Sequence, residues 1–294
     1  MRAPRAGTSL LQAYRGGPSV CEHRPGHRGG AIVSEYIYDA SLEDEHTRLH
    51  ALEAILDPGS IRVLETIGVE KSWRCLEVGG GGGSIAYWLS QHANNVVATD
   101  LDTRFLERVP ASNIEVRKHN VVTEPLEEDT YDLVHSRDVL EHIPEREAVL
   151  DKMVAALKPG GWLVAEDVDF MGALRREVFG EKSDLTLLDA RMWEAAITAM
   201  KARGVDPEYG RRLPWRLSAR GLLDIGGDVR GSFVGRGATA GMRLHELSLQ
   251  QLRPLVVSTG IPEGDIDRLL EAVRGGEYMG LGPIHVAAWG RKPA

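Results

Sequence analysis

Leu76-Glu77-Val78-Gly79-Gly80-Gly81-Gly82-Gly83 is the stretch of sequence that decides the fold of this chain. It joins a short apolar run that begins at Arg74 to a segment with helical spacing, Ser84 to His92, and so predicts a strand, a turn and a helix. Glycine has no Cβ, which allows the backbone to turn tightly and to approach a ligand closely. Five consecutive glycines are conformationally costly, so we interpret this turn as a binding loop.

Short apolar strands and helices alternate around the loop, which is typical of an α/β sheet. Further strands are predicted at 96–100, 114–117, 131–136, 162–167, 228–234 and 283–289. Helices are predicted at 84–92, 103–109, 145–157, 185–200, 248–258 and 265–273. The pattern predicts a Rossmann-like, seven-stranded, mostly parallel sheet with an N-terminal helical cap and a helical insertion after strand five.

Three parts of the chain are distinguished by composition. Residues 1–33 carry five arginines against one acid, with six glycines and three prolines, and we expect a disordered tail. An organelle transit peptide and a translation start near Val33 stay open as alternatives. Residues 34–70 form the predicted cap, with helices at 41–56 and 60–67 separated by Asp57-Pro58-Gly59. Residues 71–294 form the main domain, in which 170–225 is the expected helical lid.

The composition excludes several classes of protein. A hydrophobic content of 43% with 27% charged residues is ordinary for a globular chain, and the net charge of −8 argues against nucleic acid as a partner. No apolar run approaches the roughly 20 residues of a membrane-spanning helix. Cys21 and Cys75 are far apart, which fits a reducing cytoplasm. We therefore expect a cytoplasmic protein without a metal site, and the pattern indicates no oligomeric state.

The loop alone leaves two kinds of cofactor open. Gly81 to Ala86 satisfies G-x-G-x-x-A, which is typical of nicotinamide enzymes. Glu77, however, stands two residues before the first glycine, where its carboxylate would repel a pyrophosphate and attract a cationic group. Asp100 ends the second predicted strand, where a carboxylate can accept both hydroxyls of a ribose. A helix N-cap is the alternative role of Asp100, although Asp102 could serve there instead.

Several ordered motifs between Arg74 and Asp169 resemble those of class I S-adenosylmethionine-dependent methyltransferases. They are the loop at 76–83, the acidic strand end at 99–102, the block from His119 to Pro144 with its Y-D-L-V and L-E-H-I-P strings, and the L-K-P-G-G turn at 157–161. The segments at 206–213 and 288–291 further resemble bacterial small-molecule members. The resemblance implies S-adenosylmethionine as cofactor and an enzyme that transfers its methyl group.

The resemblance also implies cofactor contacts at the carboxyl ends of the first four strands. Glu77 and the backbone of Gly79, Gly81 and Gly83 would hold the methionine portion. Asp100 would bind the ribose, Leu101 would pack on the adenine, and Asn120 and the Val121 amide would bind its edge. Ser136 would offer its carbonyl to the ammonium group, with Arg137 beside it. Gly80 and Gly82 replace larger residues of the family, which predicts a looser loop.

Catalytic candidates follow the fourth and fifth strands. A base is needed when the acceptor loses a proton during attack, and His142 and Asp167 are the candidates. A structural hydrogen bond is the alternative for His142, and a helix cap is the alternative for Asp167. The candidates for acceptor binding are Tyr36, Tyr38, Asp169 and Tyr209.

The leading functional prediction is methylation of a small-molecule acceptor, such as a secondary metabolite or a quinone-like compound. An NAD(P)-dependent oxidoreductase is the alternative that rests on the G-x-G-x-x-A match. A third interpretation is a protein that binds the cofactor without catalysis. The sequence does not distinguish carbon, oxygen and nitrogen acceptors.

Overall fold

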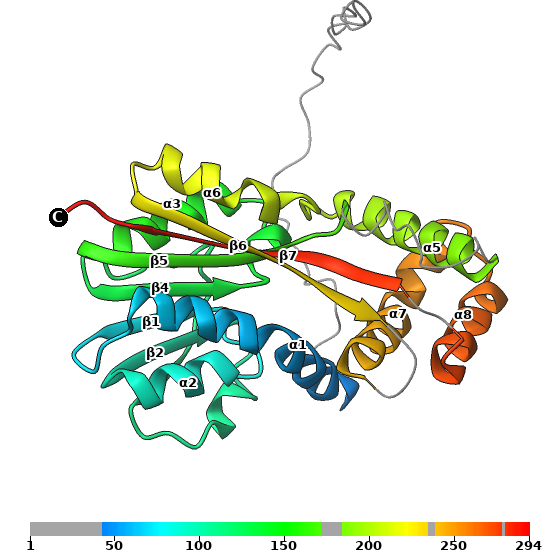
Figure 1. The fold of residues 1–294 in the computed structure, drawn as a ribbon, viewed down its shortest axis with the longest axis horizontal. Helices are drawn as coiled ribbons and strands as arrows, with labels where there is room; N and C mark the ends of the chain where they lie inside the picture. Colours follow the sequence, from blue (N-terminus) through cyan, green and yellow to red (C-terminus); the bar gives the residue numbers. More distant parts are fainter. Residues whose placement is uncertain (1–42, 172–183, 235–238, 278–279) are drawn as a thin grey trace, which may run out of the picture. The chain divides into compact units, whose positions relative to one another are not determined.

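A seven-stranded sheet forms the centre of the computed structural model, which describes residues 43–171, 184–234, 239–277 and 280–294 (Figure 1). The strands are β1 (Arg74–Val78), β2 (Asn95–Asp100), β3 (Ile114–Lys118), β4 (Tyr131–Arg137), β5 (Leu157–Asp169), β6 (Leu223–Val234) and β7 (Gly280–Arg291). Their spatial order is β3-β2-β1-β4-β5-β7-β6. β7 pairs antiparallel with β5 and with β6, and the other pairings are parallel. The predicted Rossmann-like sheet is confirmed.

Helices cover both faces of the sheet. Residues of α1 (Glu43–Ile67) and α2 (Ser84–His92) pack on one face, in a core that includes Leu64, Leu89 and Leu133. On the other face lie α3 (Arg146–Ala156) and α6 (Tyr209–Ala219), which share a core with strand residues such as Leu76 and Leu163. The strand order reverses between β1 and β4, and sheets of this kind bind ligands at the carboxyl ends of such strands.

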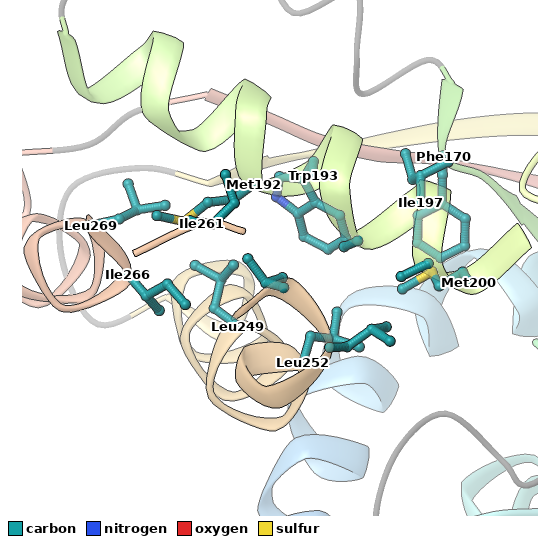
Figure 2. Close-up of a cluster of buried hydrophobic side chains, with 14 of the residues drawn as sticks. Phe170, Met192, Trp193, Ile197, Met200, Leu249, Leu252, Ile261, Ile266 and Leu269 are labelled. Atoms are coloured by element: carbon teal, nitrogen blue, oxygen red, sulfur yellow. The ribbon is translucent and has the colours of Figure 1, made fainter. Parts of the chain in front are cut away.

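Three further helices form a second hydrophobic core. Figure 2 shows residues from α5 (Asp184–Lys201), α7 (Ala240–Ser258) and α8 (Glu263–Gly275) packed together. α5 lies in the insertion predicted at 170–225. α7 and α8 lie between β6 and β7, where helices were predicted at 248–258 and 265–273. Two 3₁₀ turns complete the described elements, η1 (Leu106–Arg108) and η2 (Leu140–His142).

The expected break in the N-terminal cap is absent, because α1 continues through Pro58. Proline removes one backbone donor and would normally end or kink a helix. Here Arg230 of β6 packs against the helix, since a Cβ at Gly59 would lie 2.0 Å from its Nη1 atom. The same atom donates a hydrogen bond to the carbonyl of Leu56 at 3.3 Å. This distant contact supports the helix where the local sequence predicts a stop.

Other local predictions were also wrong. The helix expected at 103–109 is only the short turn η1. The strand predicted at 162–167 is longer, because β5 already begins at Leu157, which pairs with Tyr131. α6 was not predicted, and it contains Pro214. The predicted tail at 1–33 lies outside the described residues. Within the described residues no helix is long and apolar enough to cross a membrane.

The core predicts a large difference between two leucine substitutions. Leu163→Ala removes a fully buried side chain from β5 and should lower the free energy of unfolding by about 2–5 kcal/mol. Leu187→Ala on α5, where the side chain is 53% exposed, should change it by less than about 0.5 kcal/mol. Urea unfolding followed by circular dichroism measures both. Equal losses would contradict the described packing.

Candidate functional site

The glycine loop adopts a backbone that other residues rarely accept. Gly79, Gly81 and Gly83 have φ angles of 69°, 52° and 93°. The amides of Gly79 and Gly80 donate to the carbonyl of Thr99 on β2, at 2.8 and 3.0 Å. Left-handed φ angles favour glycine, so three alternate positions of the loop require it. The loop is therefore held in a tight turn at the carboxyl end of β1.

The other two glycines are required by close packing. A Cβ at Gly80 would lie 2.8 Å from Leu106, and one at Gly82 would lie 2.3 Å from Oε1 of Glu53. Neighbouring side chains thus fill the space that larger residues would occupy. At Gly81 the nearest atom is Cδ2 of Leu49, at 3.7 Å, so this glycine has room on its Cβ side.

Carboxylates from α1 surround the N-terminus of α2. Oε1 of Glu53 accepts a hydrogen bond from the Ser84 amide at 3.3 Å, and Asp57 accepts one from the Ser84 hydroxyl at 2.9 Å. A helix N-terminus carries partial positive charge and is where dinucleotide enzymes place a pyrophosphate. In this chain two acidic side chains already occupy that position. Sequence reasoning missed Glu53, which lies 31 residues before Ser84.

Asp100 anchors the loop to the end of β2. Its Oδ2 atom accepts from the Gly81 amide at 2.9 Å, and its Oδ1 atom accepts from the Asp102 amide at 3.0 Å. Burial raises the pKa of Asp100, although both backbone hydrogen bonds act in the opposite direction. The following side chain, Leu101, is 55% exposed. A carboxylate and an exposed apolar side chain therefore lie in sequence beside the loop.

Asn120 and Val121 lie in a turn after β3. Oδ1 of Asn120 accepts from the amides of Val122 and Thr123 at 3.0 and 3.3 Å, and so closes the turn. The ammonium of Lys152, on α3, donates to the carbonyl of Val121 at 2.9 Å. Lys152 thus holds this turn in place from α3. No local signal in the sequence had identified Lys152 as part of the site.

Ser136 and Arg137 end β4 next to the loop. Ser136 pairs in register with Val78 of β1, and its buried Oγ atom has no hydrogen-bond partner among the described residues. Nη1 of Arg137 donates to Asp57 at 2.9 Å and to Ser60 at 3.1 Å. Burial opposes the charge on Arg137, but nearby carboxylates outweigh it and raise the pKa. Arg137 therefore ties β4 to α1.

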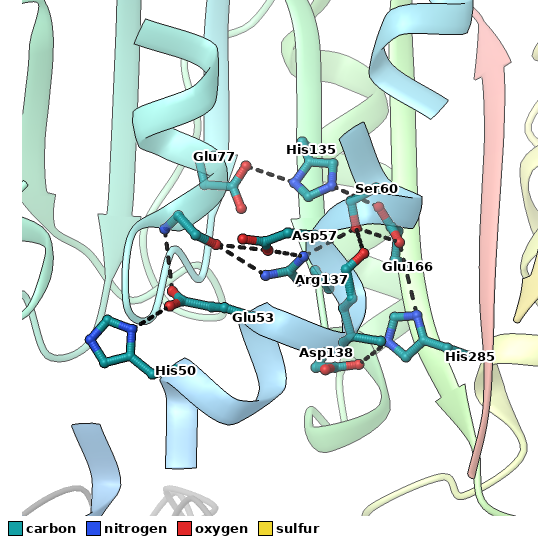
Figure 3. Close-up of polar contacts among 12 residues, drawn as sticks. His50, Glu53, Asp57, Ser60, Glu77, His135, Arg137, Asp138, Glu166 and His285 are labelled. Carbon is teal, nitrogen blue, oxygen red and sulfur yellow. Dashed lines mark hydrogen bonds and ion pairs between the residues drawn. The ribbon is translucent and has the colours of Figure 1, made fainter. Parts of the chain in front are cut away.

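A buried histidine joins two carboxylates beneath the loop (Figure 3). Nδ1 of His135 lies 2.7 Å from Oε2 of Glu77, and Nε2 lies 3.2 Å from Oε1 of Glu166. Burial alone would lower the pKa of His135, but the two carboxylates outweigh it and raise the pKa to about 9. The ring is thus an imidazolium at neutral pH. Glu77 was predicted to hold a cofactor. In the structure, one oxygen of its carboxylate is bound to the His135 ring.

The same network extends to the edge of the sheet. Oε2 of Glu166 accepts from Ser60 at 3.0 Å and from Arg230 at 2.6 Å. Burial opposes the ionisation of Glu166, but His135 and Arg230 outweigh it and lower its pKa. No group of three or more His, Cys, Asp or Glu residues in the described part of the chain is arranged to hold a metal ion.

A pocket lies at the carboxyl ends of β4 and β5, and begins one residue after Arg137. α1, α5 and α7 form most of its walls. The lining is largely apolar, with a few polar groups. The lining residues are Arg48, Leu52, Ile55, Asp138, Glu141, His142, Val168, Phe170, Trp193, Gly241, Leu244, His245, Ser248, Gly282 and Pro283.

The two predicted catalytic residues occupy different places. His142 lines the pocket, and burial lowers its pKa to about 4, so its ring is neutral at pH 7. Asp167 is not among the lining residues, and its Oδ1 atom accepts from the amides of Leu140 and Glu141 at 3.1 and 3.3 Å. Burial raises the pKa of Asp167 to about 6 and that of Glu141 well above its usual range. The Asp167 carboxyl group holds the turn that carries His142.

The predicted acceptor-binding residues are not gathered in the pocket. Asp169 is buried in an ion pair with Arg211, with N–O distances of 2.7 and 2.8 Å. Tyr209 is fully buried in the core under α3 and α6. Neither residue lines the pocket. Tyr36 and Tyr38 lie outside the described residues.

Comparisons with known proteins agree with this geometry. Residues 76–165 match the family described as "Methyltransferase domain". Methyltransferase str3 of Strobilurus tenacellus is 32% identical over 158 residues, which are 51% of this chain and 53% of that protein. A ubiquinone biosynthesis O-methyltransferase of Paracidovorax citrulli is 28% identical over 130 residues, covering 42% of this chain and 53% of that protein. The chain thus spans about half the length of these two relatives.

A solved structure shows the same fold. It is phosphoethanolamine N-methyltransferase 2 of Haemonchus contortus in complex with S-adenosyl-L-methionine, with a TM-score of 0.51 and 17% identity. The match covers 85% of this chain and 57% of that one.

The His135 network predicts a specific dependence of stability on pH. The folded pKa of about 9 exceeds the ordinary value of 6.5, so the stabilisation is complete below pH 6.5 and is lost as the pH rises to 9. The free energy of unfolding should fall by roughly 3 kcal/mol over that range, by the linkage of pKa to stability. His135→Gln should be less stable at pH 7 and should lack this slope. Urea unfolding at a series of pH values tests this, and an equal slope in the variant would contradict it.

Proposed function

We propose that this chain, which belongs to the class I S-adenosylmethionine-dependent methyltransferases through its domain at residues 76–165, methylates a small molecule held in the pocket. The observation that carries the proposal is the position of the pocket beside the glycine loop. The short segment from Ser136 to His142 contributes to both. A cofactor bound on the loop and an acceptor bound in the pocket would therefore meet at this segment.

The residues around the loop fit S-adenosylmethionine. Gly81 leaves room for a close approach, and the carboxylate of Asp100, which accepts from the Gly81 amide, would also accept from the ribose hydroxyls. Leu101 offers an exposed apolar surface for the adenine, and the turn at Asn120 and Val121 would bind its edge. The buried Oγ atom of Ser136, without a partner in the described part of the chain, marks a polar position for the methionine end.

The acidic surroundings of the loop favour a cationic cofactor over a dinucleotide. Glu53 and Asp57 bind Ser84 at the N-terminus of α2, and Glu77 lies below the loop. A pyrophosphate would have to displace Glu53 from the Ser84 amide and would meet like charge. Asp57 is paired with Arg137 and Glu77 with the imidazolium of His135, so the attraction for a sulfonium or ammonium would come mainly from Glu53. The nicotinamide alternative is therefore disfavoured by the structure around the glycines.

Methyl transfer requires little covalent chemistry from the protein itself. When bound, the cofactor supplies a methyl group on an electrophilic sulfonium. The chain's own residues would orient the acceptor in line with that group and exclude water. Leu52, Val168, Phe170 and Trp193 line the pocket with apolar side chains, which suit an acceptor with an apolar ring.

The relatives support a quinone-like or secondary-metabolite acceptor. The Paracidovorax protein is named for O-methylation in ubiquinone biosynthesis, and the pocket of this chain has the apolar lining that such a ring requires. A cofactor-binding protein without catalytic activity is the second candidate, because the predicted bases Asp167 and His142 are committed or weakly basic.

Cofactor identity can be tested by thermal unfolding of the full chain. A saturating ligand stabilises the folded state by about 2.7 kcal/mol at 100 times its dissociation constant. S-adenosylhomocysteine should therefore raise the melting temperature by roughly 5 °C or more, whereas NADH and NADPH should leave it unchanged. Stabilisation by a nicotinamide cofactor alone would refute the proposal. Stabilisation by S-adenosylhomocysteine without turnover over a broad panel of hydroxyl, amine, thiol and carbon acceptors would favour the non-catalytic protein.

The ribose contact is the second test. Asp100→Ala should weaken S-adenosylhomocysteine binding by about tenfold or more, because hydrogen bonds to a charged group are worth about 1.5–3 kcal/mol. Asp102→Ala is the matched control, since that carboxylate is bound to Arg104 at 2.6 Å. Isothermal titration calorimetry measures both affinities. An unchanged affinity in Asp100→Ala would remove Asp100 from the site.

A further inference from the structure

We propose that His245 accepts the proton of a hydroxyl-bearing acceptor during methyl transfer, and that Asp189 positions the His245 ring. The inference rests on the proposed function and adds to it a catalytic residue and the class of the acceptor. Neither residue belongs to the motifs that identify the family domain, because both lie on the helices inserted around the pocket.

The geometry places a buried carboxylate beside an imidazole that lines the pocket. Nε2 of His245 lies 3.2 Å from Oδ1 of Asp189, and the two side chains are only 3% and 1% exposed. His245 comes from α7 and Asp189 from α5, two helices that pack against each other in the second core (Figure 2). Through its charge, a buried carboxylate this close to an imidazole stabilises the imidazolium that forms when a proton is taken up.

His245 lines the pocket in which an acceptor would lie. Gly241, Leu244, His245 and Ser248 line the pocket at positions that share one face of α7. On α5, Trp193 stands four residues after Asp189, and its ring centroid lies 5.9 Å from that of His245. Phe170 continues this wall, at 6.2 Å from Trp193. A flat acceptor ring held against this wall would bring its hydroxyl group near His245.

The other ionisable groups of the pocket are less suited to take up a proton. Asp138 is hydrogen-bonded to His285 at 2.6 Å. Burial raises the pKa of Glu141 well above its usual range, which favours the protonated carboxyl group, and that form cannot take up a further proton. The pKa of His142 is about 4, which makes that ring a weak base. Arg48 is a cation, paired with Glu45.

The proposed step balances in atoms and charge. The acceptor oxygen forms a bond to the methyl carbon as the carbon–sulfur bond breaks, and the electron pair of that bond stays on sulfur. The sulfonium becomes a neutral thioether, and the hydroxyl proton passes to the ring of His245. The resulting imidazolium lies beside the carboxylate of Asp189, which stabilises its charge.

The test uses 4-nitrocatechol, whose phenol and phenolate forms absorb at different wavelengths, with the full chain. Methyl transfer from S-adenosylmethionine gives kcat and KM, and visible spectra in the presence of S-adenosylhomocysteine report the protonation of the bound probe. His245→Gln should lower kcat by about 100-fold or more with little change in KM, and should raise the pH at which the bound probe ionises. His92→Gln, on the outer face of α2, is the control and should match the wild type.

Asp189→Asn tests the positioning role without a change in side-chain volume. This variant should lower kcat by about tenfold or more and should reduce the phenolate signal of the bound probe. Asp189→Glu should restore part of the turnover and part of the phenolate signal. Circular dichroism and the affinity for S-adenosylhomocysteine establish that each variant is folded. These variants keep the proposal testable even if His245→Gln does not fold.

Three results would overturn the inference. The first is wild-type turnover and phenolate signal in folded His245→Gln or, if that variant does not fold, in Asp189→Asn. The second is loss of both in His142→Gln while His245→Gln retains them. The third is a chain that methylates amines or thiols but neither binds nor methylates 4-nitrocatechol. The third leaves the proposed function intact, whereas a chain that is not stabilised by S-adenosylhomocysteine fails at the proposed function itself.

Discussion

An imidazolium between two buried carboxylates is the interaction on which the centre of this structure depends. His135 lies on β4 and reaches Glu77 on β1 and Glu166 on β5, so one ring joins three neighbouring strands. Glu166 then binds Ser60 on α1 and Arg230 on β6. Buried ion pairs contribute little net stability compared with apolar residues, but removing one partner leaves an uncompensated charge and costs about 3–5 kcal/mol. The network therefore acts mainly by allowing one arrangement of strands and helix.

The position of α1 follows from this network and determines what the loop can bind. Ser60 and Arg230 hold the helix at its centre, and about two turns before Ser60 the side chain of Glu53 reaches the amide of Ser84. Gly80 and Gly82 therefore do not loosen the loop, contrary to the prediction from the sequence. Gly82 leaves the space that Glu53 occupies, and Leu106 fills the space beside Gly80. An acidic side chain at the start of α2 selects against phosphate and for a cation, which a motif of glycines cannot do.

The sequence was informative wherever structure is set by neighbouring residues. The apolar run at β1, the glycine turn and α2 were predicted within a residue, because strand and helix spacing are local patterns. Predictions failed where contacts between residues far apart in the sequence determine the structure. α1 continues through Pro58 because a side chain from β6 meets Gly59, and no local pattern reports that contact.

The same reasoning explains which parts of the site could be predicted. Asp100 and Leu101 follow a strand directly, so their place beside the loop follows from the topology of a parallel sheet. His135 was placed on its strand, but its charge comes from carboxylates 58 and 31 residues away. Tyr209 fitted the expected lid by sequence, yet α6 packs on the sheet face and buries it in the core. His245 and Asp189 are more than 50 residues apart in the sequence, and they lie side by side only because α5 and α7 pack together.

α1 contributes residues to both halves of the site. Leu49 and Glu53 lie one helical turn apart and approach the glycine loop, whereas Arg48, Leu52 and Ile55 line the pocket from the adjacent stripe of the same helix. A shift of α1 that tightened contacts with a bound cofactor would also move one wall of the acceptor pocket. The helix that selects the cofactor thus also shapes the acceptor pocket.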